Sequence, residues 1–207
     1  DRVNLNHFTG REWLLTEVDS FIQNEESGYF ILEAAAGMGK TTFLAWLVKQ
    51  RGYIYHFNEL TPGQEGVTTA LKNLAAQLVI AYELEPYGIL SGNVARPDYL
   101  YDLLTQAAAK QAGERIVLVV DALDEAGTPF NQNVLGLPVV LPKGVYIIAS
   151  KRPLPVSLRV ETSTTSYRPY RLREDDENNM ADMQSFLERA ALWPSISHTL
   201  RRDNYTV

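Results

Sequence analysis

Hydrophobic positions along the chain repeat with two periods, one typical of strands and one typical of helices. Short apolar stretches rich in β-branched and aromatic residues predict strands at Tyr29–Glu33, Tyr53–Phe57, Arg115–Val120, Val145–Ala149 and Tyr167–Leu172. Longer stretches with apolar residues every three or four positions predict helices at Arg11–Gln23, Thr42–Gln50, Thr68–Leu84, Pro97–Ala112 and from Glu174 onward.

This alternation of strands and helices predicts an α/β fold, with a mostly parallel sheet covered by helices on both faces. The stretches Arg115–Val120 and Val145–Ala149 are apolar almost throughout, as expected of strands buried on both faces. We expect residues 1–172 to form the core, with the helix 11–23 at its start. Residues 173–207 then begin a helical subdomain. The chain starts with Asp1 rather than Met, so we expect the natural protein to continue on both sides.

A phosphate-loop pattern, AAAGMGKTT from Ala34 to Thr42, joins the first expected strand to the helix that follows it. Small residues let the backbone wrap around phosphates, and glycines allow the unusual backbone angles that this requires. The N–H groups then point into the concavity at the positive end of the helix dipole. We expect the phosphate-binding residues to be Ala36, Gly37, Met38, Gly39, Lys40, Thr41 and Thr42.

Two side chains of this loop have the chemistry of a magnesium–nucleotide site. Lys40 is expected to reach the β and γ phosphates, and the Thr41 hydroxyl to bind Mg²⁺. The usual pattern begins with Gly, where this chain has Ala34, and one methyl group there is a modest steric change. The alternative is a glycine-rich turn with an incidental lysine, but the strand before the loop and the helix after it favour a nucleotide site.

A second acidic motif follows the apolar strand Ile116–Val120. Asp121 stands at the expected end of this strand, where it can hold Mg²⁺ directly or through water. Asp124 and Glu125, in the following turn, are expected to position or activate the water that attacks the γ phosphate. Alone, the motif also fits a buried strand followed by a polar turn with Asp124 as a helix cap. The phosphate loop makes the nucleotide interpretation the stronger one.

Charge and composition narrow the classes of partner. The net charge of −6 and the pI of about 5.1 argue against a nucleic-acid-binding surface, which usually carries a basic stripe. No apolar run approaches the roughly 20 residues of a membrane-spanning helix. The absence of Cys excludes disulfides and thiolate metal sites from this chain and suits a reducing cytosol.

The motifs resemble those of the NACHT-type and related signal-transducing (STAND) P-loop NTPases. The stretch from Asp121 to Ala126 resembles their second motif, and Gly37–Leu44 resembles their phosphate loop with its trailing apolar residues. Phe8–Glu12 resembles the segment before the core in which an arginine lies near the base. On this resemblance Arg11 contacts adenine or phosphate; otherwise it is a solvated arginine at a helix start.

Ile147–Pro153 resembles the family's sensor segment, usually Thr-Ser-Arg-Pro after a strand, whose arginine faces the γ phosphate. Here Ala149 replaces the usual Thr, and Lys151 is an extra residue before Arg152. Both Ser150 and Arg152 are therefore candidates for the sensor contact.

The resemblance implies a three-layer P-loop NTPase in which an additional strand lies between those of the two motifs. It implies a cytoplasmic, Mg²⁺-dependent ATPase that hydrolyses slowly and acts as a switch, with ATP favouring an assembled form and ADP a closed one. Self-association and further domains upstream and downstream are expected as partners. The alternatives are an AAA-type motor, a small-molecule kinase, although the chain shows no arginine-rich lid, and a module that holds nucleotide without turnover.

Overall fold

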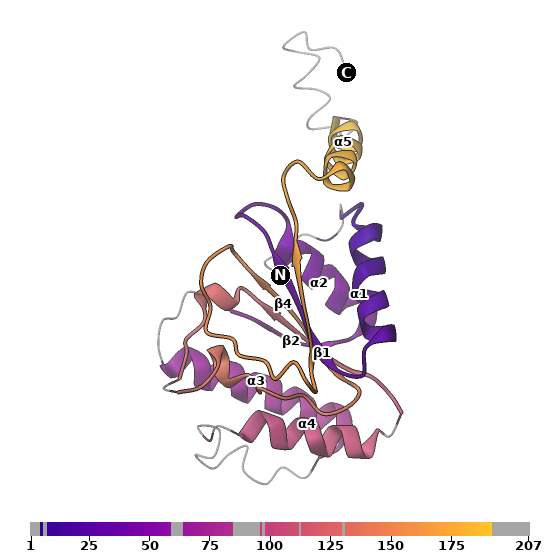
Figure 1. Cartoon of the computed structure of the whole chain (residues 1–207). Helices are drawn as coiled ribbons and strands as arrows, with labels where there is room; N and C mark the ends of the chain where they lie inside the picture. The colour runs from indigo at the N-terminus through magenta and orange to yellow at the C-terminus, as the bar shows by residue number, and fades with distance from the viewer. Residues whose placement is uncertain are drawn as a thin grey trace.

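The computed structural model describes residues 5, 8–58, 64–84, 96, 98–111, 113–129 and 131–191. Within them, the core is a five-stranded sheet in which every neighbouring pair is parallel (Figure 1). The strand order is β2-β3-β4-β1-β5, so β4 lies between the strands of the two motifs. The expected additional-strand sheet is confirmed. The strands are β1 (Gly28–Glu33), β2 (Ile54–Phe57), β3 (Ile116–Asp121), β4 (Val145–Lys151) and β5 (Ser166–Arg171).

Helices cover both faces of the sheet because successive residues of each strand point to opposite sides. In β1, Tyr29 and Ile31 belong to the core on the side of α3 and α4, whereas Phe30 and Leu32 belong to the core on the side of α1 and α2. Both cores consist of fully buried aliphatic and aromatic side chains. The helices are α1 (Glu12–Asn24), α2 (Lys40–Arg51), α3 (Gln64–Tyr82), α4 (Tyr99–Lys110) and α5 (Glu177–Ala191). The expected three-layer α/β fold is confirmed.

Two helices begin at other residues than expected. The last helix begins at Glu177, not at Glu174, because Asp176 Oδ1 accepts hydrogen bonds from the N–H groups of Asn178 (3.0 Å) and Asn179 (3.3 Å). Upstream of it, residues 174 and 175 form a turn. The helix expected from Thr68 begins at Gln64.

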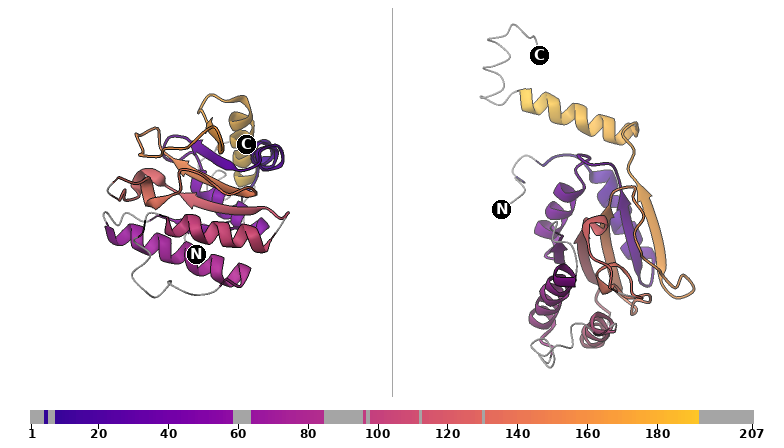
Figure 2. Two further views of the ribbon diagram at one scale, coloured as in Figure 1. Left: turned by 60° about the horizontal axis from the view of Figure 1, so that its bottom comes forward. Right: turned by 90° about the vertical axis from the view of Figure 1, so that its left-hand side faces the viewer.

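The last helix stands beyond the carboxyl ends of the strands. The chain leaves β5, passes through a short turn and forms α5 above this edge of the sheet, close to the start of α1 (Figure 2). Residues 85–95 and 97, and the part of the expected helical subdomain from residue 192 onward, lie outside the described part. No helix among the described residues is long and apolar enough to span a membrane.

Candidate functional site

Parallel pairing places the two motifs at the same edge of the sheet. The phosphate loop follows the carboxyl end of β1, and Asp121 is the last residue of β3. Across this edge, the Thr41 hydroxyl donates a hydrogen bond of 2.7 Å to Asp121 Oδ2. The two side chains expected to hold Mg²⁺ are therefore neighbours, although they stand far apart in the sequence.

The loop backbone has the shape that its glycines allow. Gly37 and Gly39 have φ angles of +81° and +77°, in the left-handed region that other residues rarely adopt. Ala34, the departure from the usual pattern, is not among the described residues with positive φ, and its N–H donates to the Lys151 carbonyl at 3.2 Å. The first position of the loop therefore has no conformational need for glycine.

The start of α2 presents unpaired backbone donors to the loop. The first helical bond here runs from Phe43 N–H to the Gly39 carbonyl at 2.9 Å, and no side chain caps the helix at Gly39. The N–H groups of Lys40, Thr41 and Thr42 precede that bond and so have no partner within the helix. Such donors, at the positive end of a helix dipole, suit an anion such as phosphate.

Lys40 lies within the same loop. Its ammonium donates to the carbonyls of Ala34 and Ala35, both at 2.8 Å. Burial lowers the pKa of Lys40, and the carboxylates of Asp121 and Asp124 oppose this effect. The lysine is thus held against the loop, within the field of the acidic motif.

Asp121 is buried, and polar groups of two neighbouring strands fix it and the turn after it. Ser150, at the end of β4, donates to Asp121 Oδ1 and accepts a 3.0 Å hydrogen bond from Ala122 N–H. Asn58, just after β2, donates to the carbonyl of Asp121. The φ angle of Ala122 is +54°, so these bonds hold a backbone conformation that alanine rarely adopts.

Asn58 was not anticipated from the sequence. The signal that would have indicated it is its position directly after an expected strand. In a parallel sheet, residues at that position meet at the same edge as the phosphate loop.

Arg152 pairs with both carboxylates of the acidic turn. Its backbone N–H donates to Asp124 Oδ1 at 2.9 Å, its Nε donates to Asp124 Oδ2, and its Nη2 lies 3.0 Å from Glu125 Oε1. Burial raises the pKa of Asp124, but the hydrogen bonds from Arg152 outweigh it and leave this pKa below its ordinary value. The Asp124 side chain is 3% exposed and that of Arg152 is 39% exposed.

The alternation of side chains at the end of β4 separates the sensor candidates from Lys151. Ser150 reaches Asp121 and Arg152 reaches Asp124, whereas the intervening Lys151 binds Glu33 Oε2 at 2.6 Å. Both candidates therefore lie at the acidic motif, and the extra lysine points to a different partner.

Arg11 approaches the phosphate loop from the side of α1. It precedes α1 with a φ of +68°, and its Nη2 donates to the Met38 carbonyl at 3.2 Å. Its Nε lies 3.9 Å from Asp182 Oδ2 of α5, and no hydrogen bond or ion pair of the described residues joins Arg11 to the acidic motif. Arg11 thus contacts the loop but stands apart from the acidic motif.

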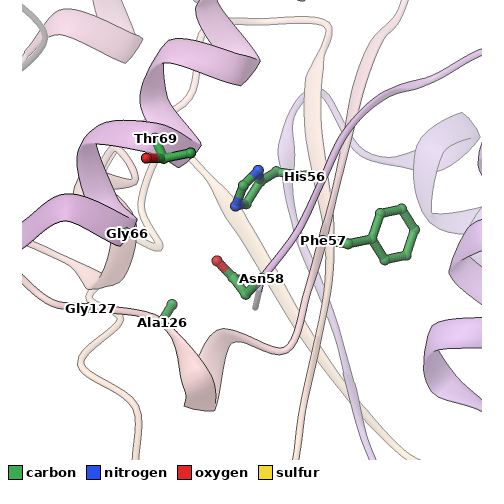
Figure 3. Close-up of a pocket in the computed structure, with 7 residues that line it drawn as sticks. All are labelled: His56, Phe57, Asn58, Gly66, Thr69, Ala126 and Gly127. Carbon is green, nitrogen blue, oxygen red and sulfur yellow. The ribbon is translucent and has the colours of Figure 1, made fainter. Parts of the chain in front are cut away.

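Two cavities adjoin the acidic motif. The larger, of about 540 Å³, is lined by Thr41, Asp121 and Glu125 together with further residues of α2 and β2. The smaller, of about 210 Å³, is shown in Figure 3: His56 and Asn58 face the start of α3 and the segment after the acidic turn. The larger cavity includes Thr41 of the phosphate loop, whereas the smaller cavity shares no residue with that loop.

The donors present fit magnesium held jointly with a phosphate. No group of three or more His, Cys, Asp or Glu side chains within the described ranges is arranged to hold a metal ion by itself. Thr41 and Asp121 supply hard oxygen atoms, and Mg²⁺ in such sites is normally held by one or two protein groups plus substrate phosphates. These two residues would hold the ion, which would neutralise phosphate charge.

Comparison with family models gives a match over the core. The family model described as Nephrocystin 3, N-terminal matches residues 9–139, which include the phosphate loop and the acidic motif. The match confirms the NACHT-like assignment made from the motifs. Comparison with curated proteins gives no match.

Solved structures show weaker likenesses. One is a signal transduction ATPase with numerous domains and a tetratricopeptide repeat sensor from Pyrococcus horikoshii. It is 16% identical with a TM-score of 0.49, over 97% of this chain and 28% of that one. Another is a structure that concerns DNA unwinding at forked double-stranded DNA by two coordinating Pif1 helicases. It is 17% identical with a TM-score of 0.31, over 75% of this chain and 36% of that one. The chain thus spans only about a third of the length of either protein.

Proposed function

The chain belongs to the Nephrocystin 3 N-terminal family, and on that premise we propose that it is the ATP-binding and ATP-hydrolysing core of a nucleotide-dependent signalling switch. The observation that carries the proposal is the 2.7 Å bond between Thr41 Oγ1 and Asp121 Oδ2. It joins the phosphate loop to the acidic motif in the arrangement that Mg²⁺ and a triphosphate require.

The residues divide the work of binding. The backbone from Ala36 to Thr42 and the Lys40 ammonium bind the phosphates, and Thr41 and Asp121 hold Mg²⁺. Asp124 and Glu125 lie in the turn after β3 and position the attacking water, and Glu125 lines the larger cavity. Lys40 has to exchange the carbonyls of Ala34 and Ala35 for phosphate oxygens, which are stronger acceptors because they are charged.

The switch component of the proposal rests on Arg152. A cation that contacts only the third phosphate gives ATP and ADP different affinities, and only such a difference moves a conformational equilibrium. In the structure Arg152 neutralises Asp124 and Glu125 instead. A γ phosphate would compete with these carboxylates for the guanidinium. Binding of ATP would therefore change the contacts of the acidic turn.

The test is calorimetric titration of the chain with ATP, ADP and GTP in the presence of Mg²⁺. We expect ATP and ADP to bind the wild-type protein. Lys40→Ala should weaken ATP binding by roughly 100-fold or more, because each charged hydrogen bond to phosphate contributes about 1.5–3 kcal/mol. Lys72→Ala is the matched control, since it removes the same charge from an exposed position on α3. Unchanged ATP affinity in Lys40→Ala would exclude the phosphate-loop function.

A further inference from the structure

The carboxylate of Asp182, in α5, binds residues at the start of α1. Its Oδ2 accepts hydrogen bonds from Arg11 N–H and from Trp13 Nε1, both at 2.9 Å, and lies 3.9 Å from Arg11 Nε. A second contact joins the same two segments, since Arg189 of α5 donates to the Thr9 hydroxyl. The helix is therefore attached to residues 9–13 at two points along its length.

The backbone of residues 10 and 11 is shaped for this contact. A Cβ on Gly10 would lie 2.5 Å from the Asp182 carboxyl carbon and from its Oδ1, so only glycine permits the close approach. The φ of Arg11 is +68°, a conformation that a non-glycine residue keeps only when its surroundings hold it. The bond from Arg11 N–H to Asp182 supplies that restraint.

The guanidinium of Arg11 is held at the tip of the phosphate loop with one donor unused. Its Nη2 donates to the Met38 carbonyl, and Nη1 is buried with no hydrogen-bond partner within the described residues. The side chain is 13% exposed. A buried, unpaired guanidinium donor is costly and is normally satisfied by a ligand or water.

The position of Arg11 indicates which part of a nucleotide would use this donor. Arg11 contacts Met38 of the loop and Asp182 of α5, and no hydrogen bond or ion pair of the described residues joins it to Asp121, Asp124, Glu125 or Arg152, which lie at the expected γ-phosphate position. Its own charged neighbours are Asp182 and Asp176. The acceptor thus belongs to the part that ATP and ADP have in common: the base, the ribose or the inner phosphates.

We propose that Asp182 is a positioning residue for nucleotide binding, which holds Arg11 against the phosphate loop and so couples the docking of α5 to the nucleotide. The inference rests on the proposed function. The ligand that Arg11 contacts is a nucleoside di- or triphosphate, and Arg11 does not distinguish between the two. Because coupling between two binding events is reciprocal, nucleotide binding favours the docked helix as much as the docked helix favours nucleotide binding.

The first test is a double-mutant cycle on the whole chain, with Mg·ATP and Mg·ADP affinities measured by calorimetry. Arg11→Ala and Asp182→Ala should each weaken both nucleotides by a similar factor, about tenfold, as expected for one charged hydrogen bond. The double variant should bind like Arg11→Ala alone, because Asp182 acts through Arg11. Glu188→Ala is the control: it removes a carboxylate from an exposed position of the same helix and should leave both affinities unchanged.

The second test is hydrogen exchange, which reports the contact without nucleotide. Asp182→Ala should speed amide exchange in residues 9–13, and Mg·ADP should slow exchange in α5 of the wild type but not of this variant. If Asp182→Ala does not fold, Asp182→Asn replaces it, because asparagine keeps the shape of the side chain. We expect the same changes in amide exchange, but smaller ones.

The outcomes separate this inference from the proposed function. Unchanged nucleotide affinity in Asp182→Ala, alongside lost binding in Lys40→Ala, overturns the coupling and leaves the nucleotide site intact. Additive losses in the cycle also overturn it, since Asp182 would then act independently of Arg11. A wild-type chain that binds no nucleotide overturns the proposed function and the inference with it.

Discussion

Arg152 binds Asp124 through both its backbone and its side chain. The backbone N–H donates to Asp124 Oδ1 at 2.9 Å, and Nε donates to Oδ2. Each oxygen of this carboxylate thus has a donor from the same residue. The pair joins the end of β4 to the turn after β3. A substitution at either residue therefore removes this ion pair and leaves the other residue free to bind a different group.

Arg152→Ala should weaken ATP binding and leave ADP binding nearly unchanged. The loss should be about tenfold, because the γ phosphate is a charged acceptor but Arg152 must give up Asp124 and Glu125 to reach it. Titration calorimetry with both nucleotides provides the measurement. Lys151→Ala removes the neighbouring cation, which binds Glu33, and should not alter the ratio of the ATP and ADP affinities. Equal losses for both nucleotides would refute a sensor role for Arg152.

Asp124→Asn should keep Mg·ATP binding and slow hydrolysis. The amide is neutral and cannot accept a proton as a carboxylate does, and general-base contributions are typically about 10²–10⁴-fold in rate. Phosphate release under single-turnover conditions is the appropriate measurement, compared with binding by calorimetry. A wild-type rate in this variant would move the water-positioning role to Glu125.

The contribution of Asp124 to stability should depend on pH. Its pKa is depressed in the folded protein, so the ionised, paired form stabilises the fold above the ordinary carboxyl value of about 3.8, and this contribution is lost as the pH falls below it. At pH 7 we expect Asp124→Asn to lower the free energy of unfolding by roughly 1–2 kcal/mol, since the partner guanidinium is partly screened by solvent. Urea denaturation at pH 7 and below pH 4 should show the two proteins converging in acid. A difference that persists or grows in acid would mean that the ion pair is not its source.

Asp121→Asn should weaken nucleotide binding only when Mg²⁺ is present. The variant loses the negative charge that attracts the ion. Its amide oxygen can accept from one of the Thr41 and Ser150 hydroxyls, and its amide NH2 can donate to the other. We expect about tenfold weaker ATP binding in Mg²⁺, because one charged contact contributes about that much to affinity, and near wild-type binding in EDTA. An equal loss in EDTA would assign the effect to distortion of the turn.

Local patterns in the sequence were sufficient to predict the layers of the fold. The strand Val145–Ala149 was predicted from apolar side chains alone, and β4 extends it only by Ser150 and Lys151. The start of the last helix differs from the expected one because Glu174 and Asp175 look like a helix start, whereas the hydrogen bonds that Asp176 accepts decide where α5 begins.

The phosphate loop and the acidic turn were predictable because the residues of each are consecutive. Glycine at positions 37 and 39 already implies positive φ, and a lysine beside them implies a place for phosphate. The apolar stretch before Asp121 also predicts that this residue stands at the end of a buried strand. Such features follow from local sterics and charge, which act over a few residues and are independent of the rest of the chain.

The tertiary structure decided which distant residues meet at the site. Only the sheet order places Ser150 on Asp121 and Arg152 on Asp124, and only the period of β4 turns Lys151 towards Glu33 instead. Asn58 joins the site from the residue after β2 and Asp182 from α5, and their neighbours in the sequence do not identify the residues that they contact. Their roles come from the parallel packing of strands and the docking of one helix, long-range events that no local pattern encodes.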